Sequence, residues 1–524
     1  MHPYPQYFPH RVDGDELDVV PLLSAGFAST SSRTLMRIDG RDFTSADLAR
    51  DVASMQARID AWGLRPGDRL AAMLGNTREH IALLYALIVS GVVWVPINTR
   101  LKAIGLRQLL ERAHPSMLVV DHEFEAVAHD AVRELPQPPR VERIEALGDA
   151  AAGPPRTIAR APGDALCIIY TSGTTGPPKG VVFTHRMLRI AAESALMVAD
   201  AGDGDRLLLW EPLCHVGGAQ MLLTPFLAAL ELHVVDRFSV SRFWPQALAA
   251  RATHLHYLGG ILDLLMRAPA DQVPPDHPVR VAWGAGVSAQ AWAPIRARFG
   301  WRLRECYGMT ECSSFATYNT EDAPGSIGRP FPWISIELVD AEGRIVDGAG
   351  TGELVLSSAV AGAFLPAYLD DPETTARVLA HGKLRTGDAA RRDERGLYYF
   401  IGRMTDSVRV RGENVSAWEV ERVIAGYPGV QDVAVVGVAS DIGEQDILAY
   451  VQAQDADFDF SALAAWADER LASHQVPRYF RRVTGFERTP SERIRKHLLD
   501  RQTAGSWDRR AARIASSIAG KDAA

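Results

Sequence analysis

The sequence predicts an α/β fold, with a large N-terminal domain and a smaller α+β domain after it. The chain has 524 residues. A chain of this length seldom folds around a single hydrophobic core, so two or more domains are expected. Over most of residues 1–401, short apolar runs alternate with amphipathic stretches of helix length. This alternation favours strands joined by crossover helices. After residue 402 the pattern changes, which predicts a second domain of different architecture.

Eight apolar runs of the N-terminal part are expected to be strands. Several are apolar on both faces, which is typical of parallel strands covered by helices. Between them, residues 77–91 and 188–202 have the spacing of amphipathic helices. The expected strands are 69–74, 92–96, 117–121, 165–170, 206–210, 233–236, 280–284 and 303–306.

The C-terminal part reads as helix, strand, strand, helix, strand, which indicates a small α+β unit. We therefore predict an N-terminal domain over residues 1–401, a hinge at 402–406 and a C-terminal cap over 407–524. The last stretch, 501–524, is polar and rich in alanine. It is expected to be a loosely docked helix without a partner strand.

Composition excludes several classes of protein. Hydrophobic residues make up 47% and charged residues 23% of the chain, as in ordinary soluble proteins. The net charge of -8 argues against nucleic acid as a partner. No apolar run reaches about 18 residues, so no membrane span is predicted, and the N-terminus lacks the pattern of a secretory signal. The four cysteines show no metal-binding or disulfide spacing, which fits a reducing cytoplasm. An oligomeric state cannot be read from these features.

The segment YTSGTTGPPKG, residues 170–180, follows an expected strand directly. Its glycines allow backbone N–H groups to turn toward a ligand, and its hydroxyl side chains add further donors. Such donor arrays bind anions, above all phosphates, and Lys179 adds a positive charge for the same anion. A Walker-type loop needs serine or threonine after the lysine, whereas Gly180 follows here, so an ordinary P-loop NTPase is disfavoured.

The same segment resembles the phosphate loop of the adenylate-forming (ANL) superfamily, which includes acyl-CoA synthetases, firefly luciferases and peptide-synthetase adenylation domains. The resemblance extends from about residue 34 to residue 500. It implies a large domain of layered sheets with flanking helices, and a small mobile cap that rotates between two half-reactions. The loop residues that would contact ATP are Thr171, Ser172, Gly173, Thr174, Thr175, Gly176 and Lys179.

Other family motifs follow in the expected order. In CYGMTE, residues 306–311, the resemblance implies that Tyr307 stacks on adenine, Gly308 lies beside it, Thr310 contacts the α-phosphate and Glu311 holds magnesium. The last role is chemically sound because a hard cation prefers carboxylate and phosphate oxygens. The segment GAG, which is Gly284, Ala285 and Gly286, resembles the lining of the adenine and acyl pockets.

The resemblance assigns further contacts. Asp388 in LRTGDAA would bind the ribose hydroxyls, and Arg403 would reach the ribose or a phosphate. The loop at Gly412 would swing toward the active site, and His215 in EPLCHVGG would gate the substrate and thiol pocket. The predicted walls of the acid pocket are Trp210, His215, Tyr257, Gly259, Gly284 and Phe315.

Two positions depart from the family pattern. The C-terminal block usually reads Pro-x-Gly-Lys, and its lysine bridges the carboxylate and the α-phosphate. Here Pro490 is followed by residues 491–492 as Ser-Glu and then by Arg493, with Lys496 three residues beyond. Either cation could act, adenylation could work differently, or both could lie on a solvated basic face. The usual hinge lysine or aspartate is replaced by Thr405.

The resemblance implies an ATP- and Mg²⁺-dependent ligase that adenylates a small aryl-acrylic or polar acid and transfers it to coenzyme A. The segments RGENVSAWEVE and TPSERIRKHLL resemble the branch of carnitine/crotonobetaine-type CoA ligases. Two alternatives stay open. The activated intermediate could go to an amine instead of CoA, including activation of nitrite for diazotisation. The chain could also be a non-catalytic nucleotide-binding homologue.

Overall fold

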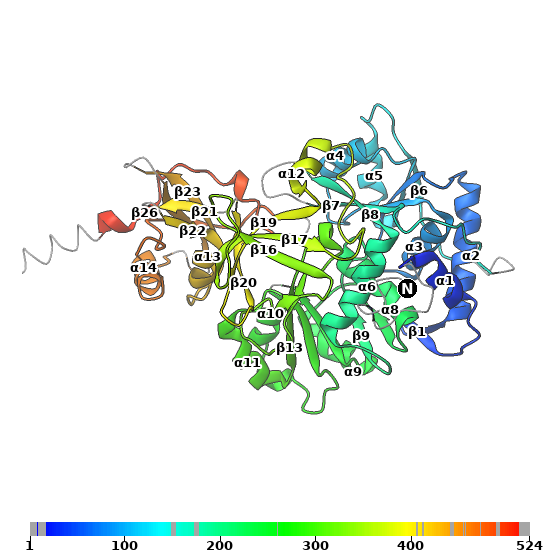
Figure 1. Cartoon of the computed structure of the whole chain (residues 1–524), viewed down its shortest axis with the longest axis horizontal. Coiled ribbons are helices and arrows are strands. Elements are labelled where there is room, and N and C mark those ends of the chain that lie inside the picture. The colour runs from blue at the N-terminus through cyan, green and yellow to red at the C-terminus, as the bar shows by residue number, and fades with distance from the viewer. Residues whose placement is uncertain are drawn as a thin grey trace, which may run out of the picture. The chain divides into compact units, whose positions relative to one another are not determined.

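The computed structural model (Figure 1) describes residues 8, 17–147, 154–171, 178–258, 260–404, 407–410, 413–440, 445–453, 455, 457–471, 473–488 and 493–512. The chain divides into two compact units. The large unit comprises described residues within Met1–Thr171, Pro178–Ile336 and Leu356–Leu384, and the small unit those within Glu337–Val355 and Arg385–Ala524. This division assigns residues 337–355 and 385–401 to the small unit, although the sequence places them in the N-terminal domain. The predicted hinge stays a prediction.

The first sheet of the large unit has six strands in the order β6-β5-β3-β4-β7-β8. Its strands run parallel except at the β7–β8 pair, which is antiparallel. The predicted phosphate loop joins β7 to β8, and its residues 172–177 lie outside the described ranges. The bounds are β3 (Arg69–Met73), β4 (Val93–Pro96), β5 (Met117–Val120), β6 (Arg140–Arg143), β7 (Ala165–Thr171) and β8 (Lys179–Thr184).

The second sheet has nine strands in the order β15-β14-β13-β12-β11-β9-β10-β1-β2. Strands β1 and β9 to β13 are parallel, so the carboxyl ends of β9, β11, β12 and β13 meet at one edge. The bounds are β1 (Thr34–Ile38), β2 (Arg41–Thr44), β9 (Arg206–Leu209), β10 (Glu231–Val234), β11 (His254–Leu258), β12 (Val281–Ala285), β13 (Arg302–Tyr307), β14 (Thr317–Tyr318) and β15 (Arg329–Pro330).

Helix α6 (His185–Ala199) lies between these two sheets, because it packs against β8 of the first and against β12 and β13 of the second (Figure 1). Most of its side chains are buried, as they are in α3, which suits helices that contact protein on all sides. Thr184 caps the N-terminus of α6, and Thr77 caps that of α3. Helix α3 ends at Gly91, whose φ is 70°.

The other helices of the large unit connect the strands. Their order confirms the α/β alternation predicted from the sequence. The α-helices are α1 (Val19–Phe27), α2 (Ser45–Ala61), α3 (Arg78–Ser90), α4 (Ala103–Ala113), α5 (Glu125–Val132), α6 (His185–Ala199), α7 (Val216–Ala219), α8 (Thr224–Leu227), α9 (Val240–Ala250), α10 (Ile261–Arg267), α11 (Ala289–Phe299) and α12 (Pro372–Val378), with short 3₁₀ helices that include η2 (Gln220–Leu223) and η4 (Thr310–Cys312).

The C-terminal part of the small unit confirms the predicted order of helix, strand, strand, helix and strand. Strands β23 to β26 form a four-stranded sheet, and β21 and β22 form a separate antiparallel pair. The bounds of the remaining elements of the chain, not all of which lie in the small unit, are β16 (Ile334–Val339), β17 (Gly350–Ser358), β18 (Leu379–Ala380), β19 (Lys383–Arg392), β20 (Tyr398–Arg403), β21 (Ser407–Val410), β22 (Glu413–Ser416), α13 (Ala417–Ala425), β23 (Val430–Ala439), β24 (Gln445–Ala453), α14 (Phe460–Asp468), β25 (Tyr479–Val483), η6 (Lys496–Leu498) and β26 (Trp507–Asp508).

The expectation that the chain after residue 501 has no partner strand is wrong for two residues. Strand β26 pairs antiparallel with β25, and the Trp507 ring lies 5.7 Å from that of Phe480. An aromatic side chain that covers an apolar sheet face is sufficient reason for the pairing.

Two further properties concern the helices and the cysteines. Across the described ranges, no helix is long and apolar enough to cross a membrane. The four cysteines are free thiols, and all four are buried: Cys167, Cys214, Cys306 and Cys312.

The buried His80 predicts loss of stability in acid. Its ring is fully buried and its Nδ1 lies 2.9 Å from the Gly75 carbonyl oxygen, and burial lowers its pKa to about 4. As the pH falls below the unfolded pKa of about 6.5, the unfolded chain gains a proton that the folded chain does not. Between pH 7 and pH 5 this should cost about 2 kcal/mol of unfolding free energy.

Urea unfolding at both pH values measures this effect. The variant H80Q should lose about 2 kcal/mol less than the wild type over the same interval. The exposed His122 supplies the control, and H122Q should follow the wild type. Equal losses in H80Q and the wild type would show that His80 is not the acid-sensitive group.

Candidate active site

The carboxyl edge of the nine-stranded sheet gathers most of the predicted site residues of the large unit. Trp210 follows β9, Tyr257 lies near the end of β11, Gly284 lies near the end of β12, and Tyr307 ends β13. These four strands are neighbours and parallel. Ligands of open α/β sheets bind outside the carboxyl ends of the strands, so this edge is the candidate active site.

Gly284 permits a close approach of two strands at this edge. Its φ is 150°, and a Cβ at this position would lie 1.9 Å from the carbonyl oxygen of Tyr257. The next residues bend away from the strand, because the backbone N–H of Gly286 donates to Glu305 Oε1 at 2.5 Å. The segment from Gly284 to Gly286 therefore needs its two glycines for backbone reasons.

Glu305 joins the end of β11 to the segment after Gly284 by hydrogen bonds, and sequence reasoning missed this residue. Its carboxylate is buried and accepts hydrogen bonds from the Tyr257 hydroxyl at 2.7 Å and from the Val287 N–H at 3.2 Å, besides that of Gly286. Burial and the adjacent carboxylate raise the pKa of Tyr257 well above its usual value. The only signal in the sequence is an acidic residue inside a buried strand, LREC.

The chain after β13 turns sharply and places Glu311 in η4. A Cβ on Gly308 would lie 1.9 Å from the Ser314 carbonyl oxygen, and Ser313 has a φ of 57°, which is unfavourable for a residue other than glycine. Backbone hydrogen bonds join Ala316 N to the Tyr307 carbonyl and Leu365 N to the Glu311 carbonyl, each at 2.9 Å. The loop is thus held from both sides. Thr310 is the first residue of η4.

Lys179 and Glu311 are linked by Tyr368, a second residue that sequence reasoning missed. Lys179 begins β8 opposite Thr171 of β7. Its Nζ lies 5.5 Å from the centre of the Tyr368 ring, and the Tyr368 hydroxyl donates to Glu311 Oε1 at 2.8 Å. A cation and a carboxylate, predicted from motifs far apart in the chain, therefore lie on either side of one buried tyrosine.

His215 lies at the N-terminus of α7, on a loop that is held by side chains from other parts of the chain. Its Nε2 is 3.4 Å from Asn98 Nδ2. Asn76, missed by sequence reasoning, donates from Nδ2 to the Glu211 carbonyl at 2.8 Å and accepts at Oδ1 from Leu213 N at 3.0 Å. The indole of Trp210 donates to the His256 carbonyl at 2.9 Å. The gating role predicted for His215 is not tested by this arrangement.

The remaining predicted pocket residues are buried. Tyr257 is fully buried, and it belongs to the hydrophobic cluster between the sheet and helices α9 to α11. Phe315 is almost buried, with its ring 6.3 Å from that of Trp283. Their predicted part in the acid pocket stays a prediction.

In the small unit, Asp388 and Arg403 lie opposite each other on β19 and β20. Their side chains form an ion pair, with Arg403 Nε 2.7 Å from Asp388 Oδ1, and Asp388 is buried. The two residues that are predicted to contact the ribose therefore lie next to each other in the small unit. Their roles toward a nucleotide stay predictions.

The two candidate cations of the C-terminal block differ in their surroundings. Lys496 is half-buried, and its Nζ lies 2.8 Å from Glu421 Oε1, which also accepts from Val435 N at 2.6 Å. Arg493 is exposed. Which of them serves adenylation stays open. Some predicted residues lie outside the described ranges: Ser172, Gly173, Thr174, Thr175, Gly176, Gly259, Thr405, Gly412 and Pro490 with the two residues after it.

Glu311 fits a magnesium ion that is held mainly by a phosphate ligand. Within the described ranges, no three His, Cys, Asp or Glu side chains gather closely enough to bind a metal by themselves. Mg²⁺ is commonly bound through one or two carboxylates, substrate phosphates and water, so a single carboxylate suffices. With Lys179 nearby, this arrangement can bind a polyphosphate and neutralise its charge.

Comparison with known proteins identifies the family of each part of the chain. Residues 25–364 match the family of AMP-binding enzymes, and residues 419–493 match the AMP-binding enzyme C-terminal domain. Crotonobetaine/carnitine–CoA ligase of Citrobacter koseri is 29% identical over 487 residues, which cover 88% of this chain and 93% of the relative. A long-chain-fatty-acid–CoA ligase of Mycobacterium tuberculosis is 31% identical over 458 residues, covering 85% and 90% of the two chains.

Among solved structures, o-succinylbenzoate CoA synthetase from Bacillus subtilis, bound to its acyl-adenylate intermediate, has a similar fold. Its TM-score is 0.83 at 24% identity, and the match covers 92% of this chain and 98% of that one. This likeness confirms the predicted fold class of a large α/β domain followed by a smaller C-terminal domain.

Proposed function

The chain belongs to the AMP-binding enzyme family, and from this premise we propose that it is an ATP-dependent acid:CoA ligase. In the proposed reaction, a carboxylate oxygen of the acid attacks the α-phosphorus of ATP. The bond from this phosphorus to the bridging oxygen breaks, and pyrophosphate leaves. The coenzyme A thiolate then attacks the acyl carbon, which gives acyl-CoA and releases AMP.

The observation that carries this proposal is the line formed by Lys179, Tyr368 and Glu311 at the edge of the sheet. Adenylation needs positioning and neutralisation of charge more than covalent chemistry. Lys179 would bind phosphate oxygens and Glu311 would hold magnesium. Both cations would stabilise the negative charge that develops on the departing pyrophosphate. Tyr368 keeps the two side chains in place.

Coenzyme A as acceptor is supported by the relatives named as CoA ligases. Their acids range from carnitine and crotonobetaine to long-chain fatty acids, so relatedness leaves the acid open. We propose a small polar or aryl-acrylic acid, as the sequence suggested. Asp388 and Arg403 keep their proposed contacts with ribose and phosphate.

Pyrophosphate release from ATP and Mg²⁺ tests the proposal. A panel of aryl, aryl-acrylic, polar and long-chain acids, with nitrite included, is assayed with and without CoA. We expect acid-dependent pyrophosphate and a matching amount of acyl-CoA, and at least 100-fold less of both with K179M. The exposed K102M is the matched control and should retain wild-type rates.

Each alternative gives a different result. Turnover that needs an amine and not CoA would identify a different acceptor. Nitrite-dependent pyrophosphate with an aryl amine would indicate diazotisation. No pyrophosphate with any acid, together with tight binding of ATP, would indicate a nucleotide-binding homologue and would overturn the proposal.

A further inference from the structure

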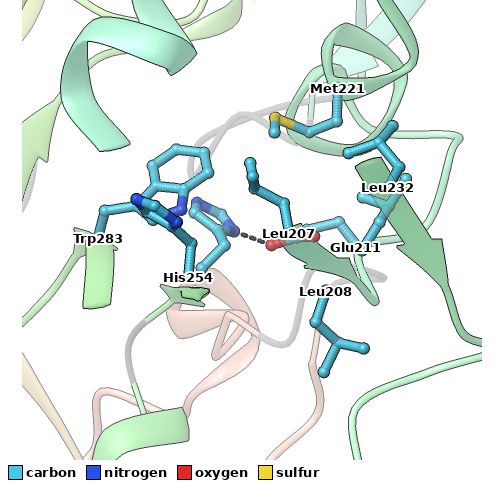
Figure 2. Close-up of a pocket in the computed structure, with 9 residues that line it drawn as sticks. Leu207, Leu208, Glu211, Met221, Leu232, His254 and Trp283 are labelled. Carbon is cyan, nitrogen blue, oxygen red and sulfur yellow. Dashed lines mark ion pairs between the residues drawn. The ribbon is translucent and has the colours of Figure 1, made fainter. Parts of the chain in front are cut away.

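A small cavity lies inside the large unit beside the candidate active site. It measures about 10 Å³, which is enough for about one water molecule. Most of its wall is apolar, with Leu207, Leu232 and Met221 among the side chains that line it (Figure 2). Three polar side chains, Glu211, His254 and His256, share this wall.

Glu211 and His256 are both buried, with 2% and 6% of their surfaces exposed. Glu211 Oε1 and His256 Nδ1 are in direct contact, which Figure 2 marks by a dashed line at Glu211; the contact is an ion pair only when the imidazole is protonated, and burial lowers the pKa of His256 to about 3. The backbone of each residue is also fixed, because Asn76 binds the Glu211 carbonyl and the Trp210 indole binds the His256 carbonyl. The pair is therefore rigidly placed.

The two atoms that form this contact, Glu211 Oε1 and His256 Nδ1, are buried and have no hydrogen-bond partner among the other described residues. A buried carboxylate oxygen without a donor costs free energy. A carboxylate oxygen can accept two hydrogen bonds, so Glu211 Oε1 can take a further donor from water or a ligand.

The pair lies on the side of the cavity that faces the candidate active site. In the parallel register, Leu207, Leu232 and His254 share one level, whereas His256 lies level with Trp283 two residues nearer the carboxyl edge. The rings of His256 and Trp283 are 4.2 Å apart. The polar pair therefore lies nearer that edge than Leu207 and Leu232 do.

The cavity wall is also adjacent in sequence to the predicted acid pocket. Glu211 follows Trp210, and Trp283 precedes Gly284. The indole of Trp210 stacks near the His256 ring at 6.1 Å. The end of an acid bound at this edge would thus lie between aromatic rings, with Glu211 at its tip.

We propose that Glu211 is a specificity-determining residue that accepts a hydrogen bond from an amino or hydroxyl group at the far end of the acid. This inference rests on the proposed function. The cavity admits about one non-hydrogen atom, so an acid that ends in such a group fits where a long alkyl chain does not. A hydrogen bond to a buried carboxylate should favour the donor-bearing acid about 10- to 100-fold in kcat/KM over a methyl analogue of equal shape.

Matched pairs of acids test the inference, since amino, hydroxyl and methyl groups are of similar size. The pairs are aminobenzoate or hydroxybenzoate against toluate, and coumarate against methylcinnamate, each in meta and para forms. The wild type should prefer the donor-bearing member about 10- to 100-fold, and E211M should lose this preference. The surface variant E342M, at an exposed glutamate, should keep it.

Two further measurements keep the test decisive. If E211M does not fold by circular dichroism, E211Q is used, and its preference for amino over methyl acids should fall at least about tenfold because the negative charge is gone. Isothermal titration of the same acids measures binding without turnover, so it separates this inference from the proposed reaction. Equal binding and turnover of both members of every pair, an unchanged preference in E211M, or best activity with a long-chain acid would overturn the inference.

Discussion

Replacing Glu311 with glutamine is expected to slow pyrophosphate release about 100- to 1,000-fold. The amide oxygen can still accept the hydrogen bond that the Tyr368 hydroxyl donates at 2.8 Å, so the loop should keep its shape. What is lost is the negative charge that a magnesium ion on the triphosphate requires. Initial rates at saturating ATP and Mg²⁺, with the best acid of the panel, measure the effect.

The variant Y368F separates the charge of Glu311 from its positioning. It removes the hydrogen bond and leaves the carboxylate and the ring beneath Lys179, so a loss of about tenfold is expected. Raised Mg²⁺ should restore part of the Y368F rate and none of the E311Q rate. An E311Q rate within threefold of the wild type would remove Glu311 from the proposed magnesium site.

Replacing Gly284 with alanine is expected to lower the free energy of unfolding by about 3 kcal/mol or more. The added Cβ would lie 1.9 Å from the Tyr257 carbonyl oxygen, and a φ of 150° is unfavourable for alanine. Both strands would have to separate, which also disturbs the contacts of Glu305. Urea denaturation followed by tryptophan fluorescence measures the change.

Gly63 provides the control for backbone conformation alone. Its φ is 79°, and no atom lies within 4 Å of the position a Cβ would take, so G63A should cost only about 1 kcal/mol. The difference between the two variants contains the steric conflict at β11 and β12 together with the larger backbone strain at a φ of 150°. Equal losses in G284A and G63A would contradict the close approach of these strands.

Local patterns in the sequence were sufficient for the α/β alternation and for the order of elements after residue 402. They did not indicate β1 and β2, or that β1 pairs with β10, about two hundred residues later. They also missed the pairing of β26 with β25. Strands β1 and β26 are short and pair with strands from other parts of the chain, and such a partner leaves no local periodicity.

In the candidate site too, the sequence indicated the residues with a local signal and missed those that depend on a distant partner. Motifs identified Lys179, Glu311 and Gly284, because a special turn or a charge beside glycines is visible in a few consecutive letters. Glu305 and Tyr368 were missed, since each acts on a residue from another element: the Tyr368 hydroxyl reaches Glu311 across 57 positions of the chain. An isolated tyrosine or glutamate carries no signal until the fold supplies its partner.

The most direct measurement follows a heavy oxygen isotope from the carboxylate of the best acid. If the acid attacks the α-phosphorus, the anhydride oxygen stays with phosphorus when CoA takes the acyl group, so each AMP should carry one labelled oxygen by mass spectrometry. Unlabelled AMP, or label in pyrophosphate, would contradict the formation of an acyl-adenylate by this protein.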